Sequence, residues 1–318
     1  MYKKWYAVLA ESYIVIMVLA MAIGLFVPQA KHLIPWTTLI LQLIFFISSL
    51  KMRTDLVWAS AKDWKFLLAV NIYMMVLLPI AVWALVWPMP TGLGMALFLL
   101  AAMPSGMTTP LLVEVAGGKQ AAAMVMVVTT SLLAPLTVPI LTKVLYGASV
   151  TIDIWGMFLK LAMVIFLPFL LAILCRHLFT ETVKKINLKT KPISIYLLGV
   201  LIIATISAQS ENLFLLSADW WKLIILIIGL YVFVVLMHLA GYFGFWWKSH
   251  AEKNTASISL TYMNFVLAIY IAGEFFPSHE ILLPLVLIIL PWATFLPVWQ
   301  QISAKLAQNP QKSKKKKR

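Results

Sequence analysis

The stretch MPSGMTTPLLVE, residues 103–114, interrupts an otherwise apolar part of the chain. TGLGMALFLLAA precedes it and VAGGKQAAAMVMVV follows it, and both have the composition of membrane helices. Proline removes a backbone donor and clashes with the preceding turn, whereas glycine relaxes the constraint on the backbone. The sequence therefore predicts that a membrane-spanning helix unwinds over residues 104–110. The alternative is a simple proline kink, which carries no site.

The composition supports this interpretation, because 63% of the 318 residues are hydrophobic and 11% are charged. Ordinary soluble domains contain about 25% charged residues. Apolar runs long enough to cross a bilayer recur along the whole chain. We expect an all-α polytopic membrane protein with ten transmembrane helices at 7–27, 33–50, 66–86, 94–116, 119–142, 154–175, 192–208, 221–245, 255–276 and 281–303.

The formal net charge of +14 reflects membrane topology rather than nucleic-acid binding. Lysine and arginine concentrate in alternate connections and in the basic tail 304–318, a distribution that places both termini in the cytoplasm. The first apolar segment lacks an A-x-A cleavage site and is interpreted as a retained helix. We expect a multi-pass protein of a bacterial-type inner membrane. Its single cysteine, Cys175, excludes disulfides and cysteine metal clusters within one copy.

Two long interior connections, 51–65 and 176–192, each follow the second helix of a five-helix block. Residues 1–147 and 153–303 therefore look like two repeats, and an odd number of helices in each makes the second repeat inverted. In such carriers, interrupted helices at matching positions of the two halves point to the binding site. The counterpart of the interrupted fourth span is the ninth, whose middle contains Ser257, Ser259, Thr261 and Asn264.

Several segments resemble the bile acid/sodium symporter family, and their order and spacing extend over nearly the whole chain. They are GLFVP at the end of the first span, FFISSLKM in the second, PSGMTTPLLVEVAGGKQAAA and TTSLLAPLTVPILT in the fourth and fifth, and AGYFGFW and MNFVLAIYIAGEFF in the eighth and ninth. The resemblance implies a panel part made of spans one, two, six and seven, and a core part made of the others. It also implies that broken helices four and nine cross in the core and that an organic anion binds between the two parts, with alternating access.

The chain departs from this family at the sodium ligands. The fourth-helix serine and asparagine fall on Thr109 and Pro110, and the ninth-helix glutamate and glutamine fall on Ser259 and Met263, although the neighbouring Asn264 is kept. The other ligand positions fall on Met74, Ala123 and Val127. Hard cations require oxygen ligands, which alanine, valine and methionine side chains do not provide. Transport is therefore expected without established sodium coupling, and Na⁺ and H⁺ both stay open as coupling ions.

The candidate substrate-binding residues are those at the expected crossing: Thr108, Thr109, Pro110, Met263 and Asn264. Their short donors and acceptors could bind a carboxylate or sulfate beside a helix N-terminus. Hydrogen bonding between helices is the competing interpretation.

Ion or proton coupling is assigned to Glu114, Thr130, Ser259 and Thr261. Glu114 is the sharpest candidate, since a carboxylate within a span often marks a proton or ion pathway. The alternative for Glu114 is an interfacial pair with Lys119, and the alternative for Thr130 is helix packing.

Lys160 could act as a counter-charge to an anion, or could extend to the outer surface. His238 is expected to be a hydrogen-bonded structural residue, and Glu274 is expected to be solvated.

A secondary carrier of a small organic anion is the function that these features favour, with membrane lipids as the other partner and no nucleic acid. The chain has no H-E-x-x-H or G-x-S-x-G motif and no G-x-x-x-x-G-K-[ST], so we expect no enzyme activity, no metal or other cofactor, and no ATP-driven transport by this chain alone. An uncoupled or proton-coupled carrier, and a channel or receptor derived from a carrier, are the alternatives.

Overall fold

The computed structural model describes residues 13–50, 63–89, 91–147, 152–180, 183, 190–211, 220–276 and 278–315. The regular structure of these residues is helical, apart from an isolated bridge between Ser105 and Met263. Six continuous helical stretches of the described residues are long and apolar enough to cross a membrane: Pro28–Leu50, Trp64–Val86, Gln120–Tyr146, Ile154–Leu178, Trp220–Gly244 and Glu280–Ala307. Shorter apolar helices lie at Val15–Phe26, Gly92–Ala102, Ile193–Ala208 and Phe265–Phe275. The chain therefore has the all-helical, polytopic character expected from its composition.

The helices of the first half follow the apolar runs, with departures where proline occurs. They are α2 (Tyr13–Phe26), η1 (Pro28–Trp36), α3 (Thr37–Leu50), α5 (Trp64–Ile72), η3 (Tyr73–Leu77), α6 (Leu78–Val86), α7 (Thr91–Ala102), α8 (Thr109–Val115) and α9 (Gln120–Tyr146). The wider turns of η3 directly precede Pro79, within a helix that runs without a break from Trp64 to Val86.

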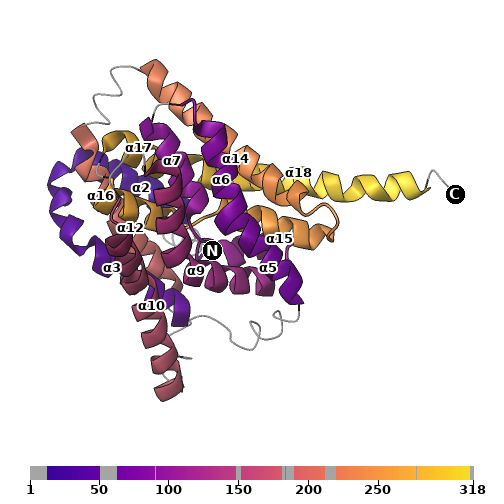
Figure 1. Cartoon of the computed structure of the whole chain (residues 1–318), viewed down its shortest axis with the longest axis horizontal. Coiled ribbons are helices and arrows are strands. Elements are labelled where there is room, and N and C mark those ends of the chain that lie inside the picture. Colours follow the sequence, from indigo (N-terminus) through magenta and orange to yellow (C-terminus); the bar gives the residue numbers. More distant parts are fainter. Residues whose placement is uncertain are drawn as a thin grey trace, which may run out of the picture.

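The helices of the second half are α10 (Ile154–Leu178), α12 (Thr190–Ala208), α14 (Trp220–Gly244), α15 (His250–Thr261), α16 (Phe265–Phe275), α17 (His279–Leu287) and α18 (Ile289–Lys315). The expected tenth span is divided at Ile288 into α17 and α18, and Pro291 lies in the first turn of α18. Residues 304–315 of the expected tail continue α18, which extends away from the body of the molecule (Figure 1). Residues 7–12, 51–62, 184–189 and 316–318 of the expected elements lie outside the described residues.

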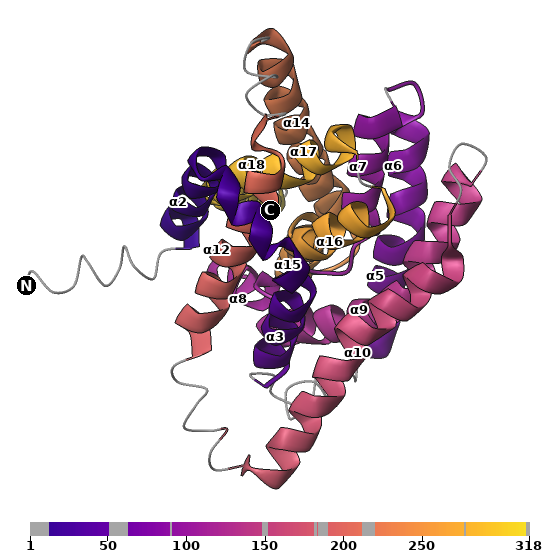
Figure 2. The ribbon, with the colours of Figure 1, turned by 90° about the vertical axis from the view of Figure 1, so that its left-hand side faces the viewer.

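Four helices pack against one another in a row. α2 contacts α12, α12 contacts α3, and α3 contacts α10 (Figure 2). These helices occupy the ranges that the family resemblance assigns to the panel part. The remaining helices surround α9, α15 and α16, and α15 is buried along most of its length although its residues are largely polar.

Both expected helix interruptions occur in the structure. The first separates α7 from α8 and covers residues 103–108, and the second separates α15 from α16 and covers residues 262–264. The first interruption is shorter than expected, because Pro110 does not unwind the chain. Pro110 lies in the first turn of α8, where its fixed φ favours the helix and no intrahelical donor is lost.

Candidate functional site

The two interrupted helices meet, and their backbones are hydrogen-bonded to each other. The Gly106 N–H donates to the Tyr262 carbonyl at 2.8 Å, and the Asn264 N–H donates to the Pro104 carbonyl at 2.8 Å. This pairing forms the bridge between Ser105 and Met263. Backbone groups that the helices leave open are thus satisfied within the protein, which is a requirement for irregular backbone at membrane depth.

Gly106 permits this close approach. A Cβ atom on Gly106 would lie 2.7 Å from the Tyr262 carbonyl oxygen and 3.1 Å from the Met263 carbonyl oxygen. Both neighbours are backbone atoms, which cannot rotate away as a side chain could. The sequence predicted that Gly106 supplies backbone freedom. In the structure Gly106 is needed chiefly because it has no side chain.

Side chains fix the crossing from several directions. Thr130 on α9 accepts a hydrogen bond from the Ser105 N–H at 3.1 Å, and the Thr109 hydroxyl donates to the Tyr262 carbonyl at 2.9 Å. The Asn264 side chain caps α16 by accepting from the Leu267 N–H at 3.1 Å. Thr130 and Thr109 are fully buried. These contacts join the crossing to α8, α9 and α16.

The far ends of α8 and α15 are also joined. The Lys119 N–H donates to the Thr255 hydroxyl at 2.7 Å, and the Asn254 amide donates to the Ala116 carbonyl at 2.9 Å. Gly117 adopts a positive φ of 74° and terminates α8, the conformation that glycine supplies at helix ends. The two short helices therefore contact each other both at the crossing and one helix length away.

An acidic residue organises this second junction. Glu252 forms a capping box with Ser249 and an ion pair with Lys119 at 3.2 Å. Burial of the Glu252 carboxylate raises its pKa, but the hydrogen bonds from Ser249 and Lys119 outweigh burial and lower the pKa to about 2. Glu252 is therefore ionised at neutral pH.

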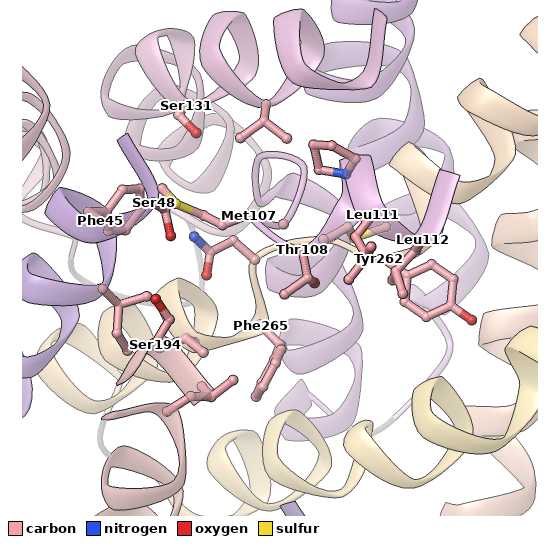
Figure 3. Close-up of a pocket in the computed structure, with 18 of the residues that line it drawn as sticks. Phe45, Ser48, Met107, Thr108, Leu111, Leu112, Ser131, Ser194, Tyr262 and Phe265 are labelled. Atoms are coloured by element: carbon pink, nitrogen blue, oxygen red, sulfur yellow. The ribbon is translucent and has the colours of Figure 1, made fainter. Parts of the chain in front are cut away.

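A cavity of about 600 Å³ lies between the crossing and the row of helices α12, α3 and α10 (Figure 3). Its size falls in the range of small-molecule sites, roughly 300–1,000 Å³. Hydroxyl and amide groups are distributed over a mainly apolar wall. The polar lining residues are Ser48, Ser49, Thr108, Gln120, Ser131, Ser194, Tyr262 and Asn264.

The apolar part of the wall comes from both sides of the cavity. Phe45 on α3 and Phe169 on α10 contribute from one side, whereas Met107, Phe265 and Trp292 contribute from the other. Such a surface suits an organic molecule with a substantial hydrocarbon or aromatic part.

Four of the five residues expected to bind substrate line this cavity: Thr108, Pro110, Met263 and Asn264. Thr109 is not among the lining residues, and its hydroxyl is engaged with the Tyr262 carbonyl. Helix geometry explains the difference, because consecutive residues at the start of α8 point in different directions. Substrate contact by the four residues stays a prediction.

The residues expected to couple ions lie behind the wall. Thr130, Ser259 and Thr261 are fully buried and are not among the lining residues. Thr130 accepts from Ser105 and donates to the Met126 carbonyl, and Thr261 donates to the Ser257 carbonyl. In this structure these two hydroxyls serve as links between or within helices.

Glu114 is exposed and accepts a hydrogen bond from the Gln120 amide at 2.6 Å. The expected pair between Glu114 and Lys119 is wrong, because Lys119 pairs with Glu252. Gln120 lines the cavity, so Glu114 lies next to a residue of its wall.

Lys160 forms an ion pair with Glu274, which connects α10 to α16. Its ammonium also lies 5.5 Å from the centre of the Phe275 ring. Lys160 is not among the cavity-lining residues, and Glu274 is exposed, as expected, although it also forms this ion pair. This pair joins the helix row to the crossing helices.

His238 has the structural environment expected of it. It is fully buried, its Nδ1 lies 3.0 Å from the Ser257 hydroxyl, and its ring stacks on Trp299. Among the described residues no cluster of histidine, cysteine, aspartate and glutamate could hold a metal ion.

Sequence reasoning missed the contribution of α3 and α12 to the cavity. Ser48, Ser49 and Ser194 line it, and Ser131 on α9 does too. The only available signal was a few serines near the ends of apolar spans. Such serines are common in membrane helices, and only the packing shows which of them face a cavity.

Residues 11–297 match the SBF-like CPA transporter family. The chain belongs to this family. It is also 27% identical over 177 residues to the probable sodium/metabolite cotransporter BASS2, chloroplastic, of Oryza sativa subsp. japonica. That match covers 54% of this chain and 39% of the rice protein. This SBF-like protein therefore combines a multi-pass helical fold with membership of a family related to the bile acid/sodium symporters.

Proposed function

We propose that this SBF-like protein is a secondary-active carrier that moves a small organic anion through the cavity by alternating access. The observation that carries the proposal is the contact between two interrupted helices beside a cavity of about 600 Å³. Helix interruptions that border a binding cavity are a recurrent feature of secondary carriers. The proposal includes the arrangement of 1–147 and 153–303 as inverted repeats, because the two interruptions fall at matching positions of those segments.

The moving parts proposed here are the row α2, α12, α3 and α10 on one side and the helices around the crossing on the other. The cavity lies between these two groups. The Lys160–Glu274 pair bridges them at the end that the charge pattern assigns to the outside. The cavity walls include Ser48, Ser194 and Gln120, which lie toward the end assigned to the cytoplasm. Both features support an inward-facing state with its outer side closed.

Sodium coupling is not part of the proposal. Met74 and Ala123, two of the positions that the resemblance assigns to sodium ligands, are fully buried apolar side chains. They offer no oxygen to a hard cation.

A cross-linking experiment tests alternating access. In a Cys175→Ser background, cysteines replace Lys160 and Glu274, and a flexible bis-maleimide joins them after reconstitution in proteoliposomes. Because the link spans the two groups of helices, we expect uptake of labelled organic anions to fall at least tenfold after cross-linking.

The matched control replaces Lys119 and Glu252, whose ion pair joins two elements of the crossing group. Cross-linking this pair should leave uptake within about twofold of the untreated variant, since both ends move together. Equal inhibition by both links, or unchanged uptake after the first, would contradict movement between the two groups. The same uptake assay is run once with a sodium gradient and once with a proton gradient across the proteoliposome membrane.

A further inference from the structure

The cavity wall contains no aspartate, glutamate, lysine, arginine or histidine among the lining residues that the structure describes. Its polar groups are neutral hydroxyls and amides. The resemblance implies an organic anion, yet the described wall offers that anion no cation.

The described charges around the cavity are engaged elsewhere. Lys160 is paired with Glu274, and Lys119 is paired with Glu252. Gln120, a lining residue, donates a hydrogen bond to an acid, Glu114. A negative charge at this position opposes an anion instead of attracting one.

The start of α16 does not replace a cation either. Asn264 already accepts from the Leu267 N–H, so this helix end is capped by the protein itself. The start of α8 also borders the cavity and has no side-chain cap, but the partial charge at either helix start is small compared with the charge of a lysine or arginine.

Two donors at the wall lack partners within the described structure. The Ser131 hydroxyl and the Trp292 indole nitrogen are buried without a hydrogen-bond partner, and both residues line the cavity. Ser131 lies on α9 with its side chain directed toward the interior (Figure 3). Ser131 is 6% exposed and Trp292 is 6% exposed. Buried donors of this kind are normally satisfied, so a ligand acceptor is a natural partner for them.

We propose that the carrier binds its organic acid in the undissociated, uncharged form, with the acid group on the neutral hydroxyl and amide groups and the apolar part against the aromatic wall. The inference rests on the carrier function proposed above. Burying an ionised carboxylate without a counter-charge is so unfavourable that acids in such places take up a proton instead. A carboxylic acid, unlike a carboxylate, both donates and accepts a hydrogen bond.

This binding mode couples the substrate to one proton. A carboxylate oxygen binds a proton from the aqueous phase before the acid enters the cavity, and the same O–H bond breaks after release on the other side. One proton and one carboxylate cross together, so the cycle moves no net charge. No ionisable protein group and no sodium ligand is required at the wall.

Three probes with the same ring separate charge from shape: naphthoic acid, naphthamide and naphthalenesulfonate. Binding to the purified full-length protein is measured by equilibrium dialysis between about pH 5 and about pH 8. Since the undissociated fraction of a carboxylic acid falls about tenfold per pH unit above its pKa, the apparent Kd of naphthoic acid should rise by that factor. Naphthamide should bind equally well at every pH, and the permanently ionised sulfonate should not bind measurably.

The substitution Ser131→Lys places a cation in the wall, and Ser131→Met is its uncharged control of similar length. Ser131→Lys should permit naphthalenesulfonate binding and flatten the pH dependence for naphthoic acid, whereas Ser131→Met should do neither. Met107→Lys, at another lining position, provides the same comparison if Ser131→Lys does not fold.

Binding of naphthoic acid with unchanged affinity across the pH range, or binding of the sulfonate to the unmodified protein, would overturn the inference and leave the carrier function intact. Failure of all three probes to bind would instead remove the cavity as the binding site, and both proposals with it.

Discussion

The two helix interruptions differ in how their ends are satisfied. The first, residues 103–108, has no side-chain cap of its own, because Thr108 at the start of α8 makes no capping hydrogen bond. Its backbone groups depend on Tyr262, Asn264 and Thr130 from other elements. The second, residues 262–264, is capped locally by Asn264. Both interruptions therefore share the backbone hydrogen bonds of the crossing, but only the second has a side-chain cap of its own.

The two interruptions also differ in exposure at one end. Residues 103–106 of the first interruption are buried, as are Tyr262, Met263 and Asn264 of the second, whereas Met107 and Thr108 are not buried. α15, which leads to the second interruption, is buried over nearly all its residues. Both interruptions contribute side chains to the cavity wall, and the more exposed of these belong to the first.

Gly106→Ala gives the largest expected effect, because it breaks the dependence of the first interruption on the second. The added Cβ would lie 2.7 Å from the Tyr262 carbonyl oxygen and would force the paired backbones apart. Overpacking of this kind costs about 1–3 kcal/mol, and the loss of the hydrogen bonds at the crossing adds to it. We expect a large fall in the thermal unfolding midpoint of the detergent-solubilised protein.

Gly229→Ala is the matched control, since a Cβ there meets no atom within 4 Å. Alanine in place of glycine within a helix is otherwise stabilising by about 0.5–1 kcal/mol. Equal midpoints for Gly106→Ala and the unmodified protein would show that the two backbones are not held together as described.

Asn264→Ala tests the local cap of the second interruption and should have an intermediate effect. It removes the acceptor for the Leu267 N–H and should destabilise the protein by about 1 kcal/mol. Asn264→Ser keeps a capping oxygen and should recover most of the loss in the same melting experiment. If alanine and serine lowered the midpoint equally, the side-chain cap would not be the source of the stability.

The sequence was sufficient to predict the helical class and the location of both interruptions. Pro104 and Gly106 gave the first, and a cluster of small polar residues ending at Asn264 gave the second. Pro110 was misjudged, since a proline is equally compatible with a helix start and a helix break. The decisive contacts, from Thr130 to Ser105 and from Lys119 to Glu252, join residues far apart in sequence, and no local pattern specifies them.

Only part of the cavity wall could be predicted from the sequence. Thr108 and Asn264 were found because they lie in the interruptions themselves, whereas Ser48 and Ser194 belong to helices with no local irregularity at those positions. The sequence analysis treated Lys160 and Glu274 as separate residues, whereas in the structure they form an ion pair between α10 and α16. Interruptions can be read from the sequence, but the surfaces that face them depend on packing.

Glu252→Gln should lower the unfolding midpoint least of these substitutions. It tests the contacts at the end of α15 that lies away from the crossing. Glutamine keeps a capping-box acceptor, so mainly the attraction to Lys119 and the longer ion pair with Lys248, at 3.8 Å, are lost. The Lys119 side chain is 50% exposed, and solvent screening therefore limits the loss to about 1 kcal/mol or less. Glu114→Gln, which alters an exposed acid outside this junction, is the control and should leave the midpoint unchanged.

The effect of Glu252→Gln on the unfolding midpoint depends on pH, because the pKa of Glu252 is lowered in the folded protein. The folded pKa of Glu252 is about 2, below its ordinary value of 4.5, so its carboxylate stabilises the fold fully above about pH 5. That stabilisation is lost as the pH falls from about 4.5 toward 2. The midpoints of the unmodified protein and Glu252→Gln should therefore differ by a constant amount between about pH 5 and pH 7 and converge below that range. A difference that grew on acidification would mean that the carboxylate does not hold α15 against the α8–α9 turn.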